Sequence, residues 1–444
     1  STAALVRDPD KCILCRRCVE ICHEVQSVGA IAPANRGIDT QILPAGGVDL
    51  DDVACVQCGQ CSLVCPVAAI FEQDHTERVW AALADPEKHV VVQTAPAIRV
   101  SIGEEFGMEP GQVTTGQLVA ALRRLGFDRV FDTDFTADLT IIEEGHELID
   151  RLTNGGVLPM ITSCSPGWIK FIEHFYPEYL DHLSTCKSPQ QMFGALAKTY
   201  YAEKAGIDPK NIYVVSIMPC TAKKFECGRP EMSASGYPDV DAALTTRELG
   251  KMLRQAGIVF SELPEDQYDD PFGITTGAGV IFGASGGVME AALRTVYEVV
   301  TKETLPSVDF TAVRGIEGIK EAEVDLKGTK VKVAVANGLG NARKLMDLIK
   351  EGKADFQFIE IMCCPGGCIG GGGQPIPTTN EIRKKRIEAI YKADTDLPLR
   401  KSHENPAVKT LYEEFLGKPL GEKSHQLLHT HYTKRGKYSK VSTG

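Results

Sequence analysis

Eight of the 15 cysteines stand in the first 65 residues, in two quartets with the same C-x2-C-x2-C-x3-C spacing. Three thiolates two residues apart can bind one face of a 4Fe–4S cubane, while the fourth points into a helix and binds a second cubane. We therefore expect two electron-relaying clusters, the first held by Cys12, Cys15, Cys18 and Cys65 and the second by Cys55, Cys58, Cys61 and Cys22. Two zinc sites are the alternative, but zinc-binding C-x2-C pairs are usually separated by a longer loop.

Three further cysteine motifs follow later: TSCSPGW at 162–168, MPCTAKKFE at 218–226 and EIMCCPGGCIGGGGQP at 360–375. Each comes directly after an apolar, strand-like run. In open α/β sheets, functional groups collect beyond the carboxyl ends of the strands, so these motifs predict one shared site. We expect four thiols to converge there, those of Cys164, Cys220, Cys364 and Cys368. A single buried cysteine would more often be structural, but three strand-end motifs beside Pro or Gly favour chemistry.

The glycine run in the third motif predicts a close approach of the backbone to a bulky inorganic group. Glycine removes the side chain and can present bare N–H groups to sulfur or to anionic ligands. A phosphate cradle is the competing interpretation. The run lacks the G-K-S/T ending of a P-loop and contains thiols, which favours the inorganic group.

The elements that position these motifs alternate along residues 86–385. Strand-like apolar runs begin near residues 89, 129, 157, 211, 330 and 356, and amphipathic helical patterns separate them. Such alternation predicts an α/β body of two lobes with largely parallel sheets, covered on both faces, with the active site between the lobes. We expect the polar stretch 261–273 to mark the seam between the lobes. The N-terminal quartets predict a separate ferredoxin-like α+β domain.

Composition limits the partners and the compartment. The 444 residues carry a net charge of −11, which argues against nucleic acid as a partner and gives no reason to expect a membrane surface. No stretch approaches the eighteen uninterrupted apolar residues of a membrane span, and the first residues do not read as a secretion signal. We therefore expect a cytoplasmic protein, and because disulfides are unlikely in a reducing cytoplasm, the clustered cysteines point to metal.

At the three later motifs the sequence resembles the [FeFe]-hydrogenase family. TSCSPGW resembles the family's TSCCPGW, MPCTAKKFE matches MPCxxKxxE, and the third motif resembles ExMxCxxGCxxGGGxP. The resemblance implies an H-cluster, which is a cubane joined through one cysteine sulfur to a two-iron unit with CO, cyanide and azadithiolate ligands. Carried over by motif, Cys220, Cys364 and Cys368 would hold this cubane, with Cys368 as the bridging thiolate.

The resemblance also implies residues around the two-iron unit. Lys223 would hydrogen-bond a cyanide, because an ammonium is the natural partner of an anionic ligand. The remaining pocket would be formed by Pro96, Ala97, Met218, Phe282, Gly283 and Met362. Ala97 stands where the family often has Ser, which removes a side-chain hydroxyl. Both methionines could equally be core residues on sequence grounds alone.

One position departs from the family pattern. Cys164 would donate the proton to the bridging amine, whereas Ser165 stands where the family has the fourth cubane ligand. Ser165, Cys363, Cys186 and water remain open as that ligand, although an alkoxide suits iron less well than a thiolate. Adjacent cysteines on an extended backbone point to opposite sides, so we expect that Cys363 is not the replacement.

A proton path is also implied by the resemblance, from Cys164 through Glu144, Ser184 and Glu147 to Arg151 at the surface. Glu144 and Glu147 stand three residues apart on one predicted helix and so share a face, which supports the path independently. A solvated helix face is the plainer interpretation of the two glutamates.

The implied activity is reversible proton reduction and H2 oxidation, with electrons passing through the two N-terminal clusters. We expect three parts: a ferredoxin-like domain at 1–85, the large-subunit body at 86–385, and a fused small-subunit-like helical belt at 386–444, of which only about the last ten residues suit a loose tail. The partner would be a ferredoxin or a redox subunit of diaphorase or formate dehydrogenase type. A slow sensory or regulatory relative is the alternative; a cluster-assembly relative would lack the intact third motif.

Overall fold

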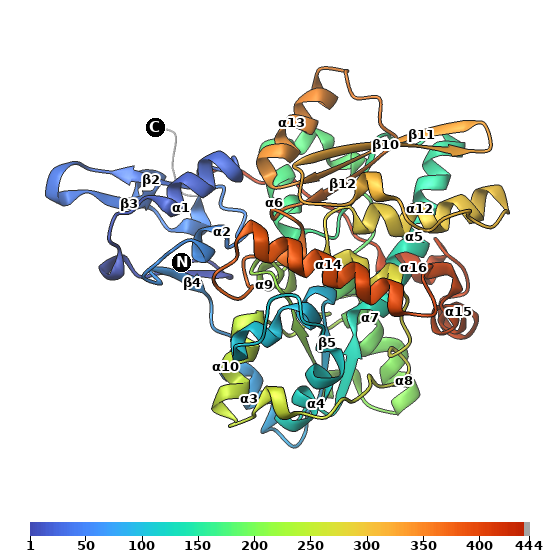
Figure 1. Cartoon of the computed structure of the whole chain (residues 1–444), viewed down its shortest axis with the longest axis horizontal. Helices are drawn as coiled ribbons and strands as arrows, with labels where there is room; N and C mark the ends of the chain where they lie inside the picture. The colour runs from blue at the N-terminus through green and yellow to red at the C-terminus, as the bar shows by residue number, and fades with distance from the viewer. Residues whose placement is uncertain (439–444) are drawn as a thin grey trace.

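A computed structural model describes residues 1–438 and shows a small N-terminal domain beside a two-lobed body (Figure 1). The N-terminal domain pairs β1 (Leu5–Arg7) with β4 (Ile70–Glu72) and β2 (Ile31–Ala34) with β3 (Gln41–Pro44), both antiparallel. Two one-turn helices, α1 (Arg17–Glu20) and α2 (Gln60–Leu63), carry parts of the two cysteine quartets. The domain core is small and includes Cys18 and Cys55 themselves.

The first lobe is built on a four-stranded parallel sheet in the order β6-β5-β8-β9. Its strands are β5 (His89–Thr94), β6 (Arg129–Asp132), β8 (Ile212–Ile217) and β9 (Ala242–Leu244). Val90 and Val92 face α3 (Thr76–Leu83), α4 (Thr115–Leu125) and α10 (Thr246–Gln255), while Val91 faces the opposite core. Both faces are therefore covered, as continuous apolar strands require.

The second lobe has a mixed sheet in the order β10-β11-β12-β7. β11 (Thr329–Asn337), β12 (Phe358–Met362) and β7 (Met160–Ile161) are parallel, and β10 (Ile319–Leu326) adds an antiparallel edge. α12 (Gly287–Thr301) covers one face, and α6 (Pro166–Phe175) with α13 (Leu339–Lys350) covers the other. The predicted two-lobed α/β architecture with largely parallel sheets is confirmed, with this hairpin edge as the exception.

The stretch 261–273, expected to mark the seam between the lobes, lies between α10 of the first lobe and α12 of the second, but the chain also passes between the lobes elsewhere. β7 belongs to the second sheet although it lies between β6 and β8 in the sequence. The 22-residue helix α5 (Thr133–Asn154) leads to it and packs against α7 (Pro189–Leu196) of the first lobe and α12 of the second. The polar stretch itself is fastened to the first lobe, where Asp269 N–H donates to the Val130 carbonyl at 2.9 Å.

Three C-terminal helices pack on the body rather than forming a separate unit. α14 (Asn380–Asp396) crosses the front of the molecule between the lobes, and α15 (Pro406–Leu411) and α16 (Glu422–Leu428) lie against the first lobe (Figure 1). Residues after α16 continue along the body to a bridge between Tyr438 and Val53. The first part of the stretch expected to be a loose tail is therefore in contact with the protein, whereas residues 439–444 lie outside the described chain. Within residues 1–438, no helix combines the length and apolar character needed to cross a membrane.

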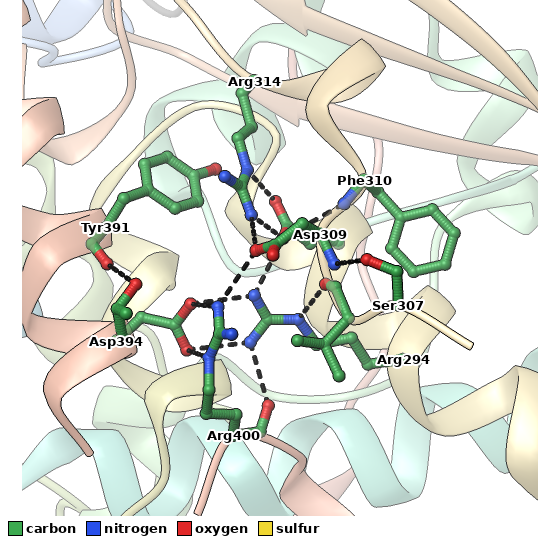
Figure 2. A network of polar contacts seen from close by, with 11 residues as sticks. Arg294, Ser307, Asp309, Phe310, Arg314, Tyr391, Asp394 and Arg400 are labelled. Atoms are coloured by element: carbon green, nitrogen blue, oxygen red, sulfur yellow. Dashed lines mark hydrogen bonds and ion pairs between the residues drawn. The ribbon is translucent and has the colours of Figure 1, made fainter. Parts of the chain in front are cut away.

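A buried ion network fastens α14 to α12 (Figure 2). Arg294 donates to both carboxylate oxygens of Asp394 at 2.9 Å and to Glu290 at 2.8 Å, and all three side chains are fully buried. Arg400 pairs with Asp394 at 2.6 Å, and Arg314 pairs with Glu290 at 2.6 Å. Charges this deeply buried are tolerated because each has more than one opposite partner.

The short helices complete the positioning of the later motifs. α9 (Ala222–Cys227) follows the turn after β8, and α11 (Gly277–Val280) precedes the turn that carries Phe282. α8 (Ala202–Ala205) extends α7 through one wider turn.

Candidate active site between the two lobes

The three later motifs converge on one buried cavity at the carboxyl ends of β5, β7, β8 and β12. Strand ends of both sheets meet there because the two lobes face each other across α5 and α14. The expected residues that line the cavity are Pro96, Cys164, Ser165, Met218, Cys220, Lys223, Phe282, Met362, Cys364 and Cys368. Ala97 and Gly283 are not in the wall; they pack behind it, where a Cβ on Gly283 would lie 3.4 Å from the Ala97 nitrogen.

Two of the expected ligand thiols in the cavity, those of Cys220 and Cys368, are poor acids where they stand. Burial raises the pKa of Cys368 to about 12, and burial followed by the charge of Cys364 raises the pKa of Cys220 further. Several buried thiolates close together are unfavourable unless a cation neutralises them. Iron–sulfur clusters supply that positive charge, so the donor set of Cys220, Cys364 and Cys368 fits a cubane.

Ser165 also faces the cavity, and its hydroxyl is already engaged. It precedes α6, and its Oγ accepts the backbone N–H of Cys363 at 3.2 Å. Cys186 is elsewhere: its Sγ lies 3.9 Å from Glu147 Oε2, and it does not line the cavity. Among the candidates for the fourth cubane position, the structure therefore places Ser165 and Cys363 at the wall and excludes Cys186.

We expect Ser165→Cys to slow the loss of iron from the active-site cubane. A thiolate suits iron better than an alkoxide and could still accept the Cys363 amide. Iron retained during incubation with a chelator, followed by the cubane's electron paramagnetic resonance (EPR) signal, measures the effect. The first N-terminal cluster, with ligands Cys12 and Cys65 among others, serves as internal control. Faster iron loss from the variant would mean that position 165 is not a ligand position.

Lys223 presents a charged ammonium to the cavity. Its Nζ donates to the Cys164 carbonyl at 3.2 Å and to Glu226 Oε2 at 2.9 Å. Burial opposes the charge, but the neighbouring Glu226 outweighs it, and the pKa of Lys223 is raised. Gln190 Nε2 also donates to Glu226 at 2.9 Å and lines the cavity. Sequence reasoning missed Gln190, for which the only signal was the polar pair QQ at the start of an otherwise apolar helix.

Three of the expected proton-path residues form a hydrogen-bonded series: Ser184, Glu147 and Arg151. Ser184 Oγ donates to Glu147 Oε2 at 2.8 Å, and Arg151 pairs with the same carboxylate at 2.7 Å. Glu144 is buried one turn before Glu147 on α5, and it interacts electrostatically with Ser184 and with Cys164. The helix α5 supplies Glu144, Glu147 and Arg151 at successive turns of one face, which is why the series is linear.

Glu144 is protonated at neutral pH. Burial, followed by the charge of Glu147, raises the pKa of Glu144 to about 8. Burial raises the pKa of Cys164 well above its ordinary value, and Glu144 raises it further once that carboxyl ionises. Both groups therefore hold protons that can be passed on, rather than standing as fixed charges.

The raised pKa of Glu144 should make the free energy of unfolding depend on pH. Between the ordinary value of 4.5 and about 8, the folded protein keeps this proton and the unfolded chain releases it. The contribution to stability is full below pH 4.5 and is lost as pH rises to about 8. We expect the stability of the wild type relative to Glu144→Gln to fall across this window and to level off beyond it. Thermal unfolding at a series of pH values measures this; a flat difference would mean an unshifted carboxyl.

The eight N-terminal cysteines also gather as two groups of four. One small cavity is lined by Cys12, Cys15, Cys18 and Cys65, and a second by Cys22, Cys55, Cys58 and Cys61. Each group takes three cysteines from one quartet and the last from the other. Each donor set fits a cubane.

The glycine run serves contacts between backbone segments in addition to the cavity. A Cβ on Gly372 would lie 2.2 Å from the Cys58 carbonyl oxygen, and one on Gly371 would lie 2.0 Å from that of Pro219. Gly367, at φ +91°, lines the cavity. The glycines therefore let the N-terminal domain press its second cluster site against the active-site loop, which the sequence alone did not indicate. Cys58 lines both cavities.

Three protein-family models match successive parts of the chain. Residues 11–69 match the 4Fe-4S dicluster domain, residues 88–372 match the iron only hydrogenase large subunit, C-terminal domain, and residues 380–435 match the iron hydrogenase small subunit. The third match begins where α14 begins, at Asn380.

The chain is similar to several characterised proteins over nearly its whole length. It is 54% identical to the NADP-reducing hydrogenase subunit HndD of Solidesulfovibrio fructosivorans, covering 98% of this chain and 75% of that protein. It is 46% identical to iron hydrogenase 1 of Clostridium pasteurianum, covering 97% and 76%. A solved structure of an [FeFe]-hydrogenase from Chlamydomonas reinhardtii matches with 47% identity and a TM-score of 0.74, covering 82% of this chain and all of that one.

Proposed function

Because this chain belongs to the iron-only, or [FeFe]-, hydrogenase family, we propose that it catalyses 2H⁺ + 2e⁻ ⇌ H2 at the cavity between the two lobes. One observation carries the proposal. The thiols of three separate motifs line the same cavity as Cys164, and a series of titratable side chains leads away from it. A structural cysteine cluster would have no use for that series.

The family's cofactors are 4Fe–4S clusters and the H-cluster. In this chain Cys220, Cys364 and Cys368 would hold the active-site cubane, with Ser165 at the fourth position and Cys368 bridging to the two-iron unit. When bound, the H-cluster supplies the redox chemistry of hydrogen.

The protein walls would orient the cofactor's ligands and keep bulk water out. The Lys223 ammonium supports a hydrogen bond to an anionic ligand such as cyanide. Met218, Met362, Phe282 and Pro96 provide apolar wall, while Ala97 and Gly283 support it from behind.

Cys164 would hold the proton that enters or leaves the cavity. The raised pKa of its thiol keeps the proton in place until a stronger base is formed beside it. Glu144 would restore that proton, Ser184 would pass it on, and Glu147 would exchange it with the surface. Arg151 fixes the Glu147 carboxylate at 2.7 Å and so keeps it aimed at Ser184.

Electrons would reach the cavity through the two N-terminal clusters, the second of which is held against the active-site loop at Cys58 and Gly372. The name of the HndD relative supports a role as the hydrogenase subunit of a larger redox complex. A ferredoxin, or a subunit of diaphorase or formate dehydrogenase type, would be the electron partner. Clusters of cysteines that act as metal ligands support a reducing compartment such as the cytoplasm.

The proposal is tested on protein matured and purified without oxygen, alongside the Clostridium pasteurianum relative as positive control. We expect infrared bands of CO and cyanide, together with H2 evolution from a reduced viologen dye. Bands with only trace turnover would favour the sensory alternative, against which the presence of Cys164 speaks. Absence of the bands, in a preparation where the control is loaded, would contradict the proposal.

A further inference from the structure

A thiol, an imidazole and a carboxylate meet beside the outer end of the expected proton path. Cys186 and His429 stand opposite each other in an antiparallel bridge between the segment before α7 and the residues after α16. Residues directly opposite in such a bridge direct their side chains to the same side. Glu147 of α5 lies on that side, with its Oε2 3.9 Å from Cys186 Sγ. One possible ligand atom from each of the three residues lies within 4.8 Å of the other two.

The imidazole of His429 is already oriented as a metal ligand would be. Its Nε2 lies 3.0 Å from Oε2 of the buried Glu143, to which it donates, so its Nδ1 keeps a lone pair. Glu143 is itself fixed by the Leu420 amide at 2.9 Å. Thr185 contacts Nδ1 through Oγ1 at 2.8 Å and donates its amide N–H to Glu147 at 3.1 Å, so Nδ1 lies towards Glu147. Metal-binding histidines commonly donate the other ring N–H to a carboxylate, which fixes the tautomer.

The group borders on solvent, so a hydrated cation has a way in. The side chains of Glu147 and Arg151 are 11% and 12% exposed, and that of His429 is 5% exposed. The ring of the exposed His425 lies beside His429, with 4.5 Å between the centroids. In a tetrahedral zinc site the ligand atoms lie roughly 3.5 Å apart, so the three atoms need to close by about 1 Å at most.

A second group of possible ligands within residues 1–438 already holds a cation. It consists of Glu298, His403 and Glu404. The Lys401 ammonium pairs with Glu298 at 2.8 Å and with Glu404 at 2.9 Å. That group also offers no thiol. It therefore serves as a control and not as a candidate.

We propose that Cys186, His429 and Glu147 bind a thiophilic divalent cation such as Zn²⁺, and that the bound ion blocks proton exchange at Glu147. A thiolate, an imidazole and a carboxylate together suit zinc, and three protein ligands leave the fourth position to water. The binding rests only on the residues described above, whereas the block rests on the proposed function.

The block follows from the atom that the ion would take. Glu147 Oε2 accepts the Ser184 hydroxyl at 2.8 Å, and the same oxygen faces Cys186. A carboxylate bound to a metal stays deprotonated, because the ion occupies the lone pair that a proton would use. A proton passed on by Ser184 would then find no acceptor. H2 evolution and H2 oxidation should both slow.

The test adds zinc sulfate stepwise to protein matured and purified without oxygen. After gel filtration we expect about one zinc per chain, with a zinc K-edge X-ray absorption spectrum that shows one sulfur at about 2.3 Å beside nitrogen and oxygen at about 2.0–2.2 Å. Both readings are specific for zinc, so the iron does not interfere. H2 evolution from a reduced viologen should fall by about a hundredfold at saturating zinc, the lower end of the cost of losing a positioned acid or base. A brief exposure to a chelator should restore it.

Cys186→Ser and His429→Gln should each raise the zinc concentration for half-inhibition by about tenfold or more, at least the cost of losing an outer partner of a metal ligand. Serine keeps the size of the cysteine, and glutamine keeps an amide donor for Glu143, so turnover without zinc should stay within a few-fold of wild type. The matched controls are Cys227→Ser and His403→Gln, which change a thiol and an imidazole outside the group. Both should keep the zinc sensitivity of wild type.

Four results would overturn the proposal. Zinc that does not bind, or binds without a sulfur ligand, would exclude the site. Unchanged zinc sensitivity of Cys186→Ser would place the inhibition elsewhere. Loss of iron in step with inhibition would mean that zinc attacks the clusters. Bound zinc with full turnover would refute the block. If the matured protein shows no turnover at all, the proposed function fails, and zinc content with the absorption spectrum still decides whether the site exists.

Discussion

Replacing Cys164 with serine should lower H2 turnover by about two to four orders of magnitude while every cluster stays bound, the range typical of losing a positioned acid or base. Cys164 lines the cavity without belonging to the cubane donor set, and its carbonyl, which accepts from Lys223 at 3.2 Å, is unchanged by the substitution. A serine hydroxyl fits the same space but gives up its proton far less readily than a thiol. Turnover with a reduced viologen, compared with iron content and infrared spectrum, separates proton supply from assembly.

The matched control is Cys227→Ser, which changes a half-buried thiol at the end of α9 outside the cavity wall. It should leave turnover within a few-fold of wild type. Glu147→Gln should also lower H2 turnover, as Cys164→Ser does, because an amide cannot relay a proton by titrating. If matured Cys164→Ser retains wild-type turnover, protons reach the cavity by another route.

Replacing Asp394 with asparagine should lower the free energy of unfolding by about 3–5 kcal/mol, the cost of removing one partner from a buried ion pair. Asp394 is fully buried between Arg294 and Arg400, and asparagine keeps its shape while removing the charge (Figure 2). Arg294 would keep Glu290, but the amide NH2 of asparagine cannot accept one of the two hydrogen bonds that Arg294 now donates to Asp394. Because the network fastens α14 to α12, the C-terminal belt should loosen first.

Chemical denaturation with a fluorescence probe measures the loss, and hydrogen exchange in α14 locates it. Glu323→Gln is the control, since it breaks the exposed pair of Glu323 and Lys330 on the β10–β11 hairpin, where about 0–1 kcal/mol is expected. Equal effects of the two substitutions would mean that the buried network contributes no more than a surface pair.

Local patterns predicted most of the elements. The apolar runs after residues 89, 129, 211, 330 and 356 became β5, β6, β8, β11 and β12, because a strand buried on both faces needs a continuous apolar sequence. Two strands were not predicted from the sequence. β9 (Ala242–Leu244) is too short to give a clear pattern, and in β10 (Ile319–Leu326) apolar residues are interrupted by lysine and glutamate. The sequence also did not predict that β7 belongs to the second sheet, because packing rather than sequence order decides which strands pair.

The sequence by itself determined the chemistry of this protein: the ligand types, their spacing, the family motifs and the face shared by Glu144 and Glu147. These features are local, and residue type and periodicity encode them directly. Only the tertiary structure decided that Cys186 lies outside the cavity, that Ala97 and Gly283 stand behind its wall, and that Cys58 of the N-terminal domain lines the same cavity as Cys363. Cys58 and Cys363 are far apart in the chain, and no motif in the sequence indicates that they lie near the same cavity. They share it because glycines at positions 59 and 372 let two backbones of different domains come closer than side chains would permit.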